Sequence, residues 1–595
     1  MNMRSQLAEA RGDGAISKVT RQKWWTSAFF TSVVVASVAL FFVSRGKWSD
    51  AIIDSGREWI VPDALARGDL LYRDVVYWFG PFTPYFHAAF FRLLGSSFRT
   101  LVLTGVVGSV GVLAALWFAL RRVTGRAEAT LWTALAIPAL VFMPNAGGSI
   151  LGMGYRMWHA AAFALLATGV LVGGSRRSVT GAVGAGALCG MAGLCRTEWG
   201  IACVAACVVA VLVSRNFRAG SFLEVSAIIS GFVLIFGGTL GAFVLISGPQ
   251  AVIRDGHVLL TGLPPETRRF FVAFSGISDW RTGLAQAIYS AAMWLGVVLL
   301  LEIAAAGAHE QDGTRKRATR IAAVVILLGA SALAGGASGA VLFSAAPAVC
   351  VIATAVGLAR RDDPRDPALA AFGLLGLVLS YRRPFHIGDS GYVGPSLLFA
   401  FVCSAGLLQR FLDRNLDGRS KSRLRPLVNT AILCLICVAF LARAWQYLSD
   451  RRVRIAGAEG MLSARSEVSH ELATISAAIR ARTLEGDSLV VLPEGEILNY
   501  LSKRSNPIRH KLLIPGYLTD QNEAAVLADL VDAKPNAVVL LNRSTSEYGP
   551  SGLGQGYGRA IRSWIEANYR LSPFDSRQTL SARTHPWALV GFRKR

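Results

Sequence analysis

Long blocks of apolar residues, separated by short polar or basic clusters, run along most of this 595-residue chain. Many of these blocks approach the roughly 20 residues that an α-helix needs to cross the hydrocarbon of a bilayer. A membrane β-barrel would instead show shorter segments of alternating polarity. The pattern therefore predicts an all-α polytopic domain of about 13 transmembrane helices. We place them near residues 26–44, 101–120, 130–143, 156–173, 179–195, 200–213, 222–247, 283–307, 319–334, 341–358, 368–380, 391–409 and 427–445.

The pattern changes after the last apolar block. Polar stretches with helical periodicity then alternate with short apolar and β-branched runs at residues 488–492, 537–541 and 587–592. Two amphipathic stretches, 522–531 and 560–567, can cover a sheet built from those runs. We therefore predict a small C-terminal α/β soluble domain. The expected domains are a cytoplasmic tail at 1–25, a transmembrane domain at 26–446 with a large first outer loop at 45–100, and the soluble domain at 447–595.

The distribution of charge orients the predicted helices. The formal net charge is +23, but the Lys and Arg residues sit in short turns instead of one stripe, which argues against a nucleic-acid partner. With the N-terminus in the cytoplasm, every inner loop is basic, as the positive-inside rule requires. These inner loops are residues 121–126, 175–177, 214–218, 314–317, 360–361 and 410–425. The expected location is the bacterial cytoplasmic (inner) membrane, with the C-terminal domain in the periplasm.

The cysteines and glycines indicate no cofactor. All eight cysteines lie in or beside apolar segments, so neither a disulfide scaffold nor a zinc site is expected. Four alternating glycines at 552–558 precede a helix, but they follow no strand, and a flexible loop explains them better than a nucleotide site. We expect no cofactor and no metal site, and leave open whether a divalent cation assists.

Basic residues on the outer face need a reason, because the positive-inside rule disfavours them there. Three outer segments contain them. The first outer loop carries Arg57, Glu58 and Arg73, and the turn at 195–199 carries Arg196 and Glu198. The segment at 381–392 carries Arg382, Arg383, His386 and Asp389. His386 and Asp389 can bind an acceptor, a phosphate or a cation, but two residues do not predict a metal site.

Asp54 and Arg57 follow directly after the first predicted span. A carboxylate can take up a proton from an acceptor, and arginines can hold phosphate oxygens bidentately. Transfer from a phosphate-linked donor needs both groups, and Arg196, Arg382 and Arg383 are further candidate phosphate ligands expected on the same face. The alternative is a solvated loop whose aromatic residues, such as Trp78 and Phe82, anchor an interfacial helix.

A resemblance to a known family rests on these residues. An acidic residue follows the first span, Gly68-Asp69 precedes Leu71-Tyr72-Arg73-Asp74, and Gly80-Pro81 precedes an aromatic helix. Together these features resemble the integral-membrane glycosyltransferases of the GT-C superfamily, in particular its protein O-mannosyltransferase-like and lipid A aminoarabinose transferase-like branch. The resemblance is strongest over residues 45–200.

The resemblance implies roles for several residues. In the family, the Asp of an Asp-Glu pair in the first periplasmic loop is the catalytic or acceptor-positioning acid, which implies this role for Asp54. This sequence departs from the pattern, because Ser55 stands in place of the Glu and the next carboxylate is Glu58. We expect Glu58, Tyr72, Arg73, Asp74 and Glu198 to contribute to substrate binding with the arginines.

The implied function is an inverting glycosyltransferase. It would take a sugar from a polyprenyl-phosphate donor and transfer it to a glycolipid, polysaccharide or protein acceptor outside the cytoplasm, with the bilayer holding the donor's tail. One alternative is a transporter or flippase of lipid-linked sugars, although such proteins usually carry polar groups inside their spans. Another is a ligase or polymerase that joins preassembled glycans.

Overall fold

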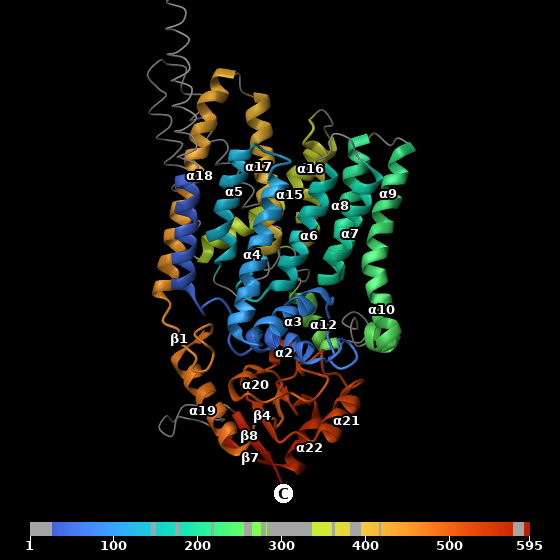
Figure 1. The fold of residues 1–595 in the computed structure, drawn as a ribbon, viewed down its shortest axis with the longest axis vertical. Helices are drawn as coiled ribbons and strands as arrows, with labels where there is room; N and C mark the ends of the chain where they lie inside the picture. Colours follow the sequence, from blue (N-terminus) through green and yellow to red (C-terminus); the bar gives the residue numbers. More distant parts are fainter. Residues whose placement is uncertain are drawn as a thin grey trace, which may run out of the picture.

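The computed structural model describes residues 27–143, 150–172, 178–215, 219–254, 265–274, 281, 336–359, 363–380, 394–415, 418–574 and 588–594. Long helices run side by side in a bundle, and a smaller region of strands and short helices covers one end of it (Figure 1). We call this end the capped end. The predicted combination of a helical membrane protein with a small strand-containing C-terminal region is confirmed.

Seven of the described helices are long and apolar enough to cross a bilayer: Ser27–Ser44, Phe98–Leu120, Tyr155–Val172, Thr197–Ser214, Ser221–Ser247, Gly394–Asp413 and Arg425–Ser449. Three shorter apolar helices are Val179–Cys195, Val349–Ala359 and Asp366–Leu379. The predicted count of 13 stays a prediction, because the spans expected at 283–307 and 319–334 lie outside the described residues.

The bundle consists of the following elements after the first helix: α4 (Phe98–Leu120), α5 (Arg126–Ala136) with η1 (Ile137–Val141), α6 (Tyr155–Val172), α7 (Val179–Cys195), α8 (Thr197–Arg215), α9 (Ala219–Phe232) with η2 (Val233–Gly237) and α10 (Gly238–Ser247), η3 (Gln250–Arg254), α15 (Gly336–Ala359), α16 (Asp366–Ser380), α17 (Gly394–Asn415) and α18 (Gly418–Ser449). Helix α4 begins at the capped end, so the basic turn at 121–125 lies at the opposite end (Figure 1).

The loop at 45–100, predicted to be the first outer loop, is largely helical. Helices α2 (Asp54–Arg67) and α3 (Phe82–Leu94) lie across the capped end, between the bundle and the C-terminal region (Figure 1). Helix α12 (Pro265–Phe274) lies at the same end. Seven of the ten positions of α2 after Arg57 are apolar, and the buried residues of the helix include Glu58 and Asp63 as well as Trp59 and Ile60. The helix therefore buries charge as well as apolar surface.

The C-terminal region contains a four-stranded sheet in the order β3-β4-β8-β7. Strands β3 (Leu489–Leu492) and β4 (Ala537–Leu541) are parallel, while β8 (Ala588–Arg593) is antiparallel to β4 and to β7 (Tyr569–Phe574). The three predicted strands and both predicted helices are confirmed, whereas β7 was not predicted. The remaining elements are β1 (Val453–Arg454), β2 (Ser463–Ala464), α19 (Ser466–Arg482), α20 (Ile497–Ser502), α21 (Glu523–Ala533), η7 (Ser546–Tyr548), β5 (Gly552–Leu553), β6 (Gly556–Tyr557) and α22 (Arg559–Asn568).

Helix α2 and the C-terminal region pack at close range. A Cβ atom at Gly56 would overlap the backbone of Glu496 and Ile497, so only glycine permits this approach. Nearby, the N–H of Val76 donates to the carbonyl of Arg509 at 3.0 Å, and the Arg509 side chain donates to the carbonyl of Arg73 at 2.7 Å. Backbone contact of this kind fixes the register between the two parts.

We expect Gly56→Ala to loosen this packing. The added methyl group has no space without a backbone shift, and overpacking of this kind costs roughly 1–3 kcal/mol. The unfolding midpoint of the purified protein should fall, and protease should cut more readily between α18 and the C-terminal region. Gly111→Ala on α4 is the matched control, because nothing lies within 4 Å of a Cβ there. Equal stability of the two variants would contradict the close packing at Gly56.

Candidate functional site

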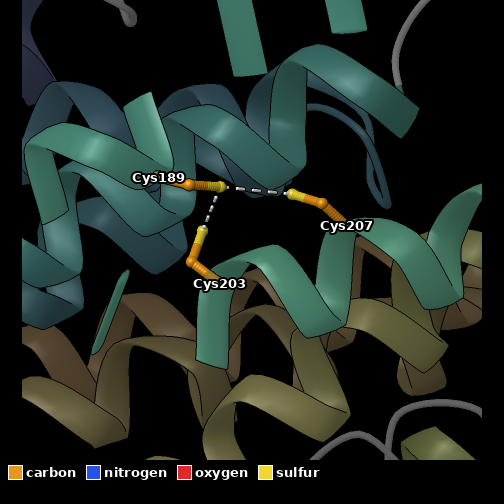
Figure 2. A group of neighbouring side chains, drawn as sticks. All are labelled: Cys189, Cys203 and Cys207. Carbon is orange, nitrogen blue, oxygen red and sulfur yellow. Dashed lines mark hydrogen bonds between the residues drawn. The ribbon is translucent and has the colours of Figure 1, made fainter. Parts of the chain in front are cut away.

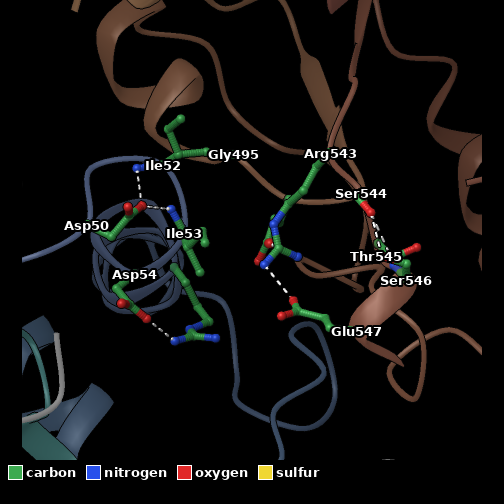
Figure 3. A network of polar contacts seen from close by, with 12 residues as sticks. Asp50, Ile52, Ile53, Asp54, Gly495, Arg543, Ser544, Thr545, Ser546 and Glu547 are labelled. Atoms are coloured by element: carbon green, nitrogen blue, oxygen red, sulfur yellow. Dashed lines mark hydrogen bonds and ion pairs between the residues drawn. The ribbon is translucent and has the colours of Figure 1, made fainter. Parts of the chain in front are cut away.

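Asp54 and Arg57 begin helix α2 at the capped end. The preceding Asp50 accepts the backbone N–H groups of Ile52 and Ile53 at 2.9 and 2.7 Å, which fixes the turn into the helix (Figure 3). One turn apart on α2, Arg57 Nη2 lies 2.6 Å from Asp54 Oδ1. Burial raises the pKa of Asp54, and the Arg57 charge opposes that shift. The two residues predicted to act together are thus in direct contact.

A second ion pair lies one helical turn further on. Glu58 is 5% exposed and lies 2.8 Å from Arg156, which is in the first turn of α6. The Arg156 guanidinium also donates to Tyr77 Oη at 3.3 Å and lies 3.9 Å from the centroid of the Phe79 ring. Burial raises the pKa of Glu58, and Arg156 opposes that shift. This pair joins the first outer loop to the bundle.

Arg196 comes to the same aromatic ring from another helix end. It is the residue between α7 and α8, where it pairs with Glu198 at 2.6 Å, and its guanidinium carbon lies 5.4 Å from the Phe79 centroid. A Cβ atom at Gly80 would overlap the backbone of Leu194, so glycine lets the loop reach the end of α7. Arg156 and Arg196 therefore share Phe79 as a neighbour.

Tyr72, Arg73 and Asp74 hold the shape of the first outer loop. Tyr72 is fully buried and donates its hydroxyl to the carbonyl of Phe79 at 2.8 Å. Asp74 pairs with Arg73 at 2.8 Å and accepts the N–H of Leu70 at the same distance, which closes a turn. Their predicted contribution to substrate binding stays a prediction. Arg382, Arg383, His386 and Asp389 lie outside the described residues.

The C-terminal region adds charged residues that the sequence did not indicate. Glu494 follows β3 and Arg543 follows β4, and since these strands are parallel, their carboxyl ends lie at one edge of the sheet. Arg543 lies 2.5 Å from Glu494 and 3.0 Å from Glu547. Arg57, Asp54 and Asp50 all perturb the pKa of Glu494, although burial is the larger effect and raises it. The charged residues at the start of α2, Asp50, Asp54 and Arg57, therefore belong to one polar network with this sheet edge (Figure 3).

Glu496 is a buried acid beside this network. It is fully buried, and its carboxylate accepts the N–H of Gly495 at 3.2 Å. Burial raises its pKa to about 8. The side chain is therefore largely protonated at neutral pH and adds little negative charge to the site.

Arg156 could have been found by the same criterion that identified Arg196. It is a basic residue at the outer end of a predicted span, but it was counted as part of the span at 156–173. Glu494 and Arg543 carry no comparable local signal. They meet only because β3 and β4 pair across the 44 residues of chain between Leu492 and Ala537.

Three cysteines converge inside the bundle. Cys189 on α7 has its sulfur 3.2 Å from that of Cys203 and 3.8 Å from that of Cys207, both on α8 (Figure 2). Among the described residues, they are the one group of three His, Cys, Asp or Glu side chains that lie close enough to share a metal ion. All three are buried among apolar residues, which suits neutral thiols packing between helices. We include them in no part of the site.

No family model and no curated protein matches the sequence. Solved structures are similar in fold. ArnT from Cupriavidus metallidurans bound to undecaprenyl phosphate has a TM-score of 0.52 at 14% identity, covering 95% of this chain and 98% of that chain. Its apo form has a TM-score of 0.51 at the same identity and coverage. The archaeal oligosaccharyltransferase AglB from Archaeoglobus fulgidus, in complex with an inhibitory peptide and a dolichol-phosphate, reaches 0.48 at 13% identity, covering 93% of this chain and 74% of that chain.

The similarity to ArnT extends over nearly the full length of both chains. At this identity it shows a shared fold and no more. The resemblance to the GT-C glycosyltransferases that the sequence suggested is confirmed at that level.

We expect Arg156→Gln to destabilise the protein more than the double variant Glu58→Gln/Arg156→Gln. Removing one partner leaves a buried charge unpaired, which costs roughly 3–5 kcal/mol, whereas removing both does not. Unfolding midpoints of the wild type, both single variants and the double variant measure the difference. Arg99→Gln is the control, because Arg99 is 66% exposed and its Glu459 partner lies 3.7 Å away. A double variant less stable than Arg156→Gln would contradict the pairing.

Glu496→Gln should stabilise the protein increasingly as pH rises from 4.5 to about 8. The folded protein holds a proton that the unfolded chain releases, so wild-type stability falls over this interval while the Gln variant escapes the loss. The free energy of unfolding of the variant should exceed that of the wild type by up to about a few kcal/mol, and this difference should level off above that interval. Unfolding midpoints at a series of pH values test this, with Glu485→Gln at an exposed turn as control. A pH-independent difference would contradict a protonated Glu496.

Proposed function

We propose that this chain is a membrane glycosyltransferase that moves a sugar from a polyprenyl-phosphate donor to an acceptor on the extracytoplasmic face. The carrying observation is that the carboxylate of Asp54 and the guanidinium groups of Arg57, Arg156 and Arg196 gather at one end of a lipid-embedded bundle. The shared fold with ArnT, whose crystal structure contains undecaprenyl phosphate, supports the proposal.

Asp54 is the proposed base. Its carboxylate takes the proton of an acceptor hydroxyl, the hydroxyl oxygen bonds to C1 of the sugar, and the bond from C1 to the phosphate oxygen breaks. Attack from the face opposite the phosphate inverts C1. Burial of Asp54 favours this role, because it raises the carboxylate's affinity for a proton, while the Arg57 charge opposes that shift.

The arginines are the proposed phosphate ligands. Negative charge grows on the phosphate as the C1 bond breaks, and positive groups fixed in advance stabilise that charge most where water is excluded. Glu58 and Phe79 hold Arg156 in place, and Glu198 and Phe79 do the same for Arg196. Arg382 and Arg383 are further proposed phosphate ligands, and His386 and Asp389 are proposed to face the acceptor.

The position of the charges favours transfer over transport. In the described membrane helices, acidic and basic residues lie within the first or last two turns, for example Arg156 on α6 and Arg410 on α17. A path for a polar headgroup through the bilayer usually requires such groups near its middle. The described part of the chain offers a reaction site at one face instead. A ligase acting on a diphosphate-linked glycan would use the same site and differ in its donor.

We expect Asp54→Asn to reduce sugar transfer by roughly 10²–10⁴-fold, the usual contribution of a general base. Mass spectrometry of polyprenyl-phosphate sugars and surface glycans should compare cells that lack the protein, cells with the wild type and cells with the variant. The donor should accumulate, and one acceptor should lack a sugar, in both the null and the Asp54→Asn strains.

Asp63→Asn is the matched control, because Asp63 lies on the same helix and pairs with Arg67 instead. Complementation by Asp63→Asn with failure of Asp54→Asn supports the assignment. Full complementation by Asp54→Asn, or unchanged donor and acceptor pools in the null strain, would overturn it.

A further inference from the structure

Arg543 is held firmly in the C-terminal region. It lies 2.5 Å from Glu494, which is 1% exposed, and 3.0 Å from Glu547. Glu547 belongs to the short helix η7, and α12 packs on that helix: Phe270 and Tyr548 have ring centroids 4.5 Å apart, and Thr267 donates to the Tyr548 carbonyl at 3.3 Å. Glu494 and Glu547 thus hold the Arg543 guanidinium, and α12 packs on the short helix that carries Glu547.

This guanidinium faces the start of α2. Arg543 extends from its loop toward the helix that carries Asp54 (Figure 3). The backbone approach at Gly56 sets this arrangement, because it brings Glu496 against the same helix. Burial raises the pKa of Asp54, and the charge of Arg543 is one of those that oppose this shift; the Asp54 charge in turn influences Glu494.

We propose that Arg543 is a positioning residue of the site: the C-terminal region, docked on α2, holds this guanidinium toward Asp54 and completes the charge balance of the active site. Glu494 is the anchor that fixes it. The inference rests on the proposed function for its meaning in catalysis, but the electrostatic contact exists independently of any substrate. It also gives the C-terminal region a specific task, since neither α2 nor the bundle supplies this charge.

Several charged groups face Asp54. Arg57 comes from its own helix and Asp50 from the turn before it. Arg156 comes from α6, and Arg543 with Glu494 comes from the sheet edge. Glu58 lies one turn along α2, and its pKa also responds to Asp54. Groups of both signs influence the carboxylate, so removing a positive or a negative one should move its protonation in opposite directions.

The test measures the protonation of Asp54 directly. A hydrophobic carbodiimide reacts with protonated carboxyl groups, so its labelling of Asp54 across a pH series, followed by peptide mass spectrometry, gives a midpoint equal to the pKa. The full-length protein in lipid nanodiscs is compared with Arg543→Gln, Glu494→Gln, Arg543→Lys and the control Arg562→Gln. Arg562 forms an exposed pair with Glu566 on α22.

We expect the midpoint to rise in Arg543→Gln and to fall in Glu494→Gln, each by on the order of half to one pH unit for partly screened charges. Arg543→Lys keeps the charge and should stay near the wild type, as should Arg562→Gln. A purely structural ion pair would make both partner variants behave alike. Shifts in the same direction, or none in either folded variant, would overturn the proposal.

Unfolding midpoints identify any variant that fails to fold. If Arg543→Gln is such a variant, Arg543→Lys is compared with the wild type instead. If the Lys variant differs from the wild type as much as Arg543→Gln does, charge is not the property that matters and the proposal fails. Because no donor or acceptor enters this experiment, its failure is distinct from a failure of the glycosyltransferase assignment, which the cellular mass spectrometry tests separately.

Discussion

Charge buried beside a lipid bilayer must be paired, and this constraint shapes the capped end of the molecule. Removing a carboxylate or a guanidinium from water costs several kcal/mol per ion, roughly, unless an opposite charge and hydrogen bonds replace the water. Asp54 with Arg57, Glu58 with Arg156 and Glu494 with Arg543 meet this requirement in succession. Asp54 and Arg57 both belong to α2, Glu58 with Arg156 joins α2 to the bundle, and Glu494 with Arg543 joins the ends of β3 and β4. The close backbone approach at Gly56 then holds α2 against the C-terminal region.

The helices and the two buried strands could be predicted because their apolar patterns lie within short stretches of sequence. Apolar blocks gave the helices, and the runs at 488–492 and 537–541 gave β3 and β4, because both are buried on two faces. Strand β7 escaped prediction because it is an edge strand: it contains Arg570 and Pro573, and most of its residues are at least partly exposed. An apolar run was therefore not required there.

The site was predictable only in part, for a related reason. Asp54 and Arg57 were recognisable because they follow a span directly and lie one helical turn apart. Asp74 belongs to a similar acidic and basic mixture, yet its contacts close a turn within the loop. Composition cannot distinguish a carboxylate that closes a turn from one that meets a substrate. The contribution of Glu494 and Arg543 depends on strand pairing and on the backbone approach at Gly56. Neither contact can be predicted from the sequence around these two residues.

The assembly of the site from separate parts suits a substrate that is itself divided between two environments. In the proposed reaction the polyprenyl tail of the donor remains in the bilayer, where the exposed surface of the helices is apolar, while its phosphate reaches the boundary with water. Arginines at helix ends, such as Arg156 and Arg196, can meet the phosphate at that depth. The proposed acceptor comes from the aqueous side, where the C-terminal region lies over α2. Asp54, the proposed base at the start of α2, then lies between the two approaches, where charges of both parts influence it.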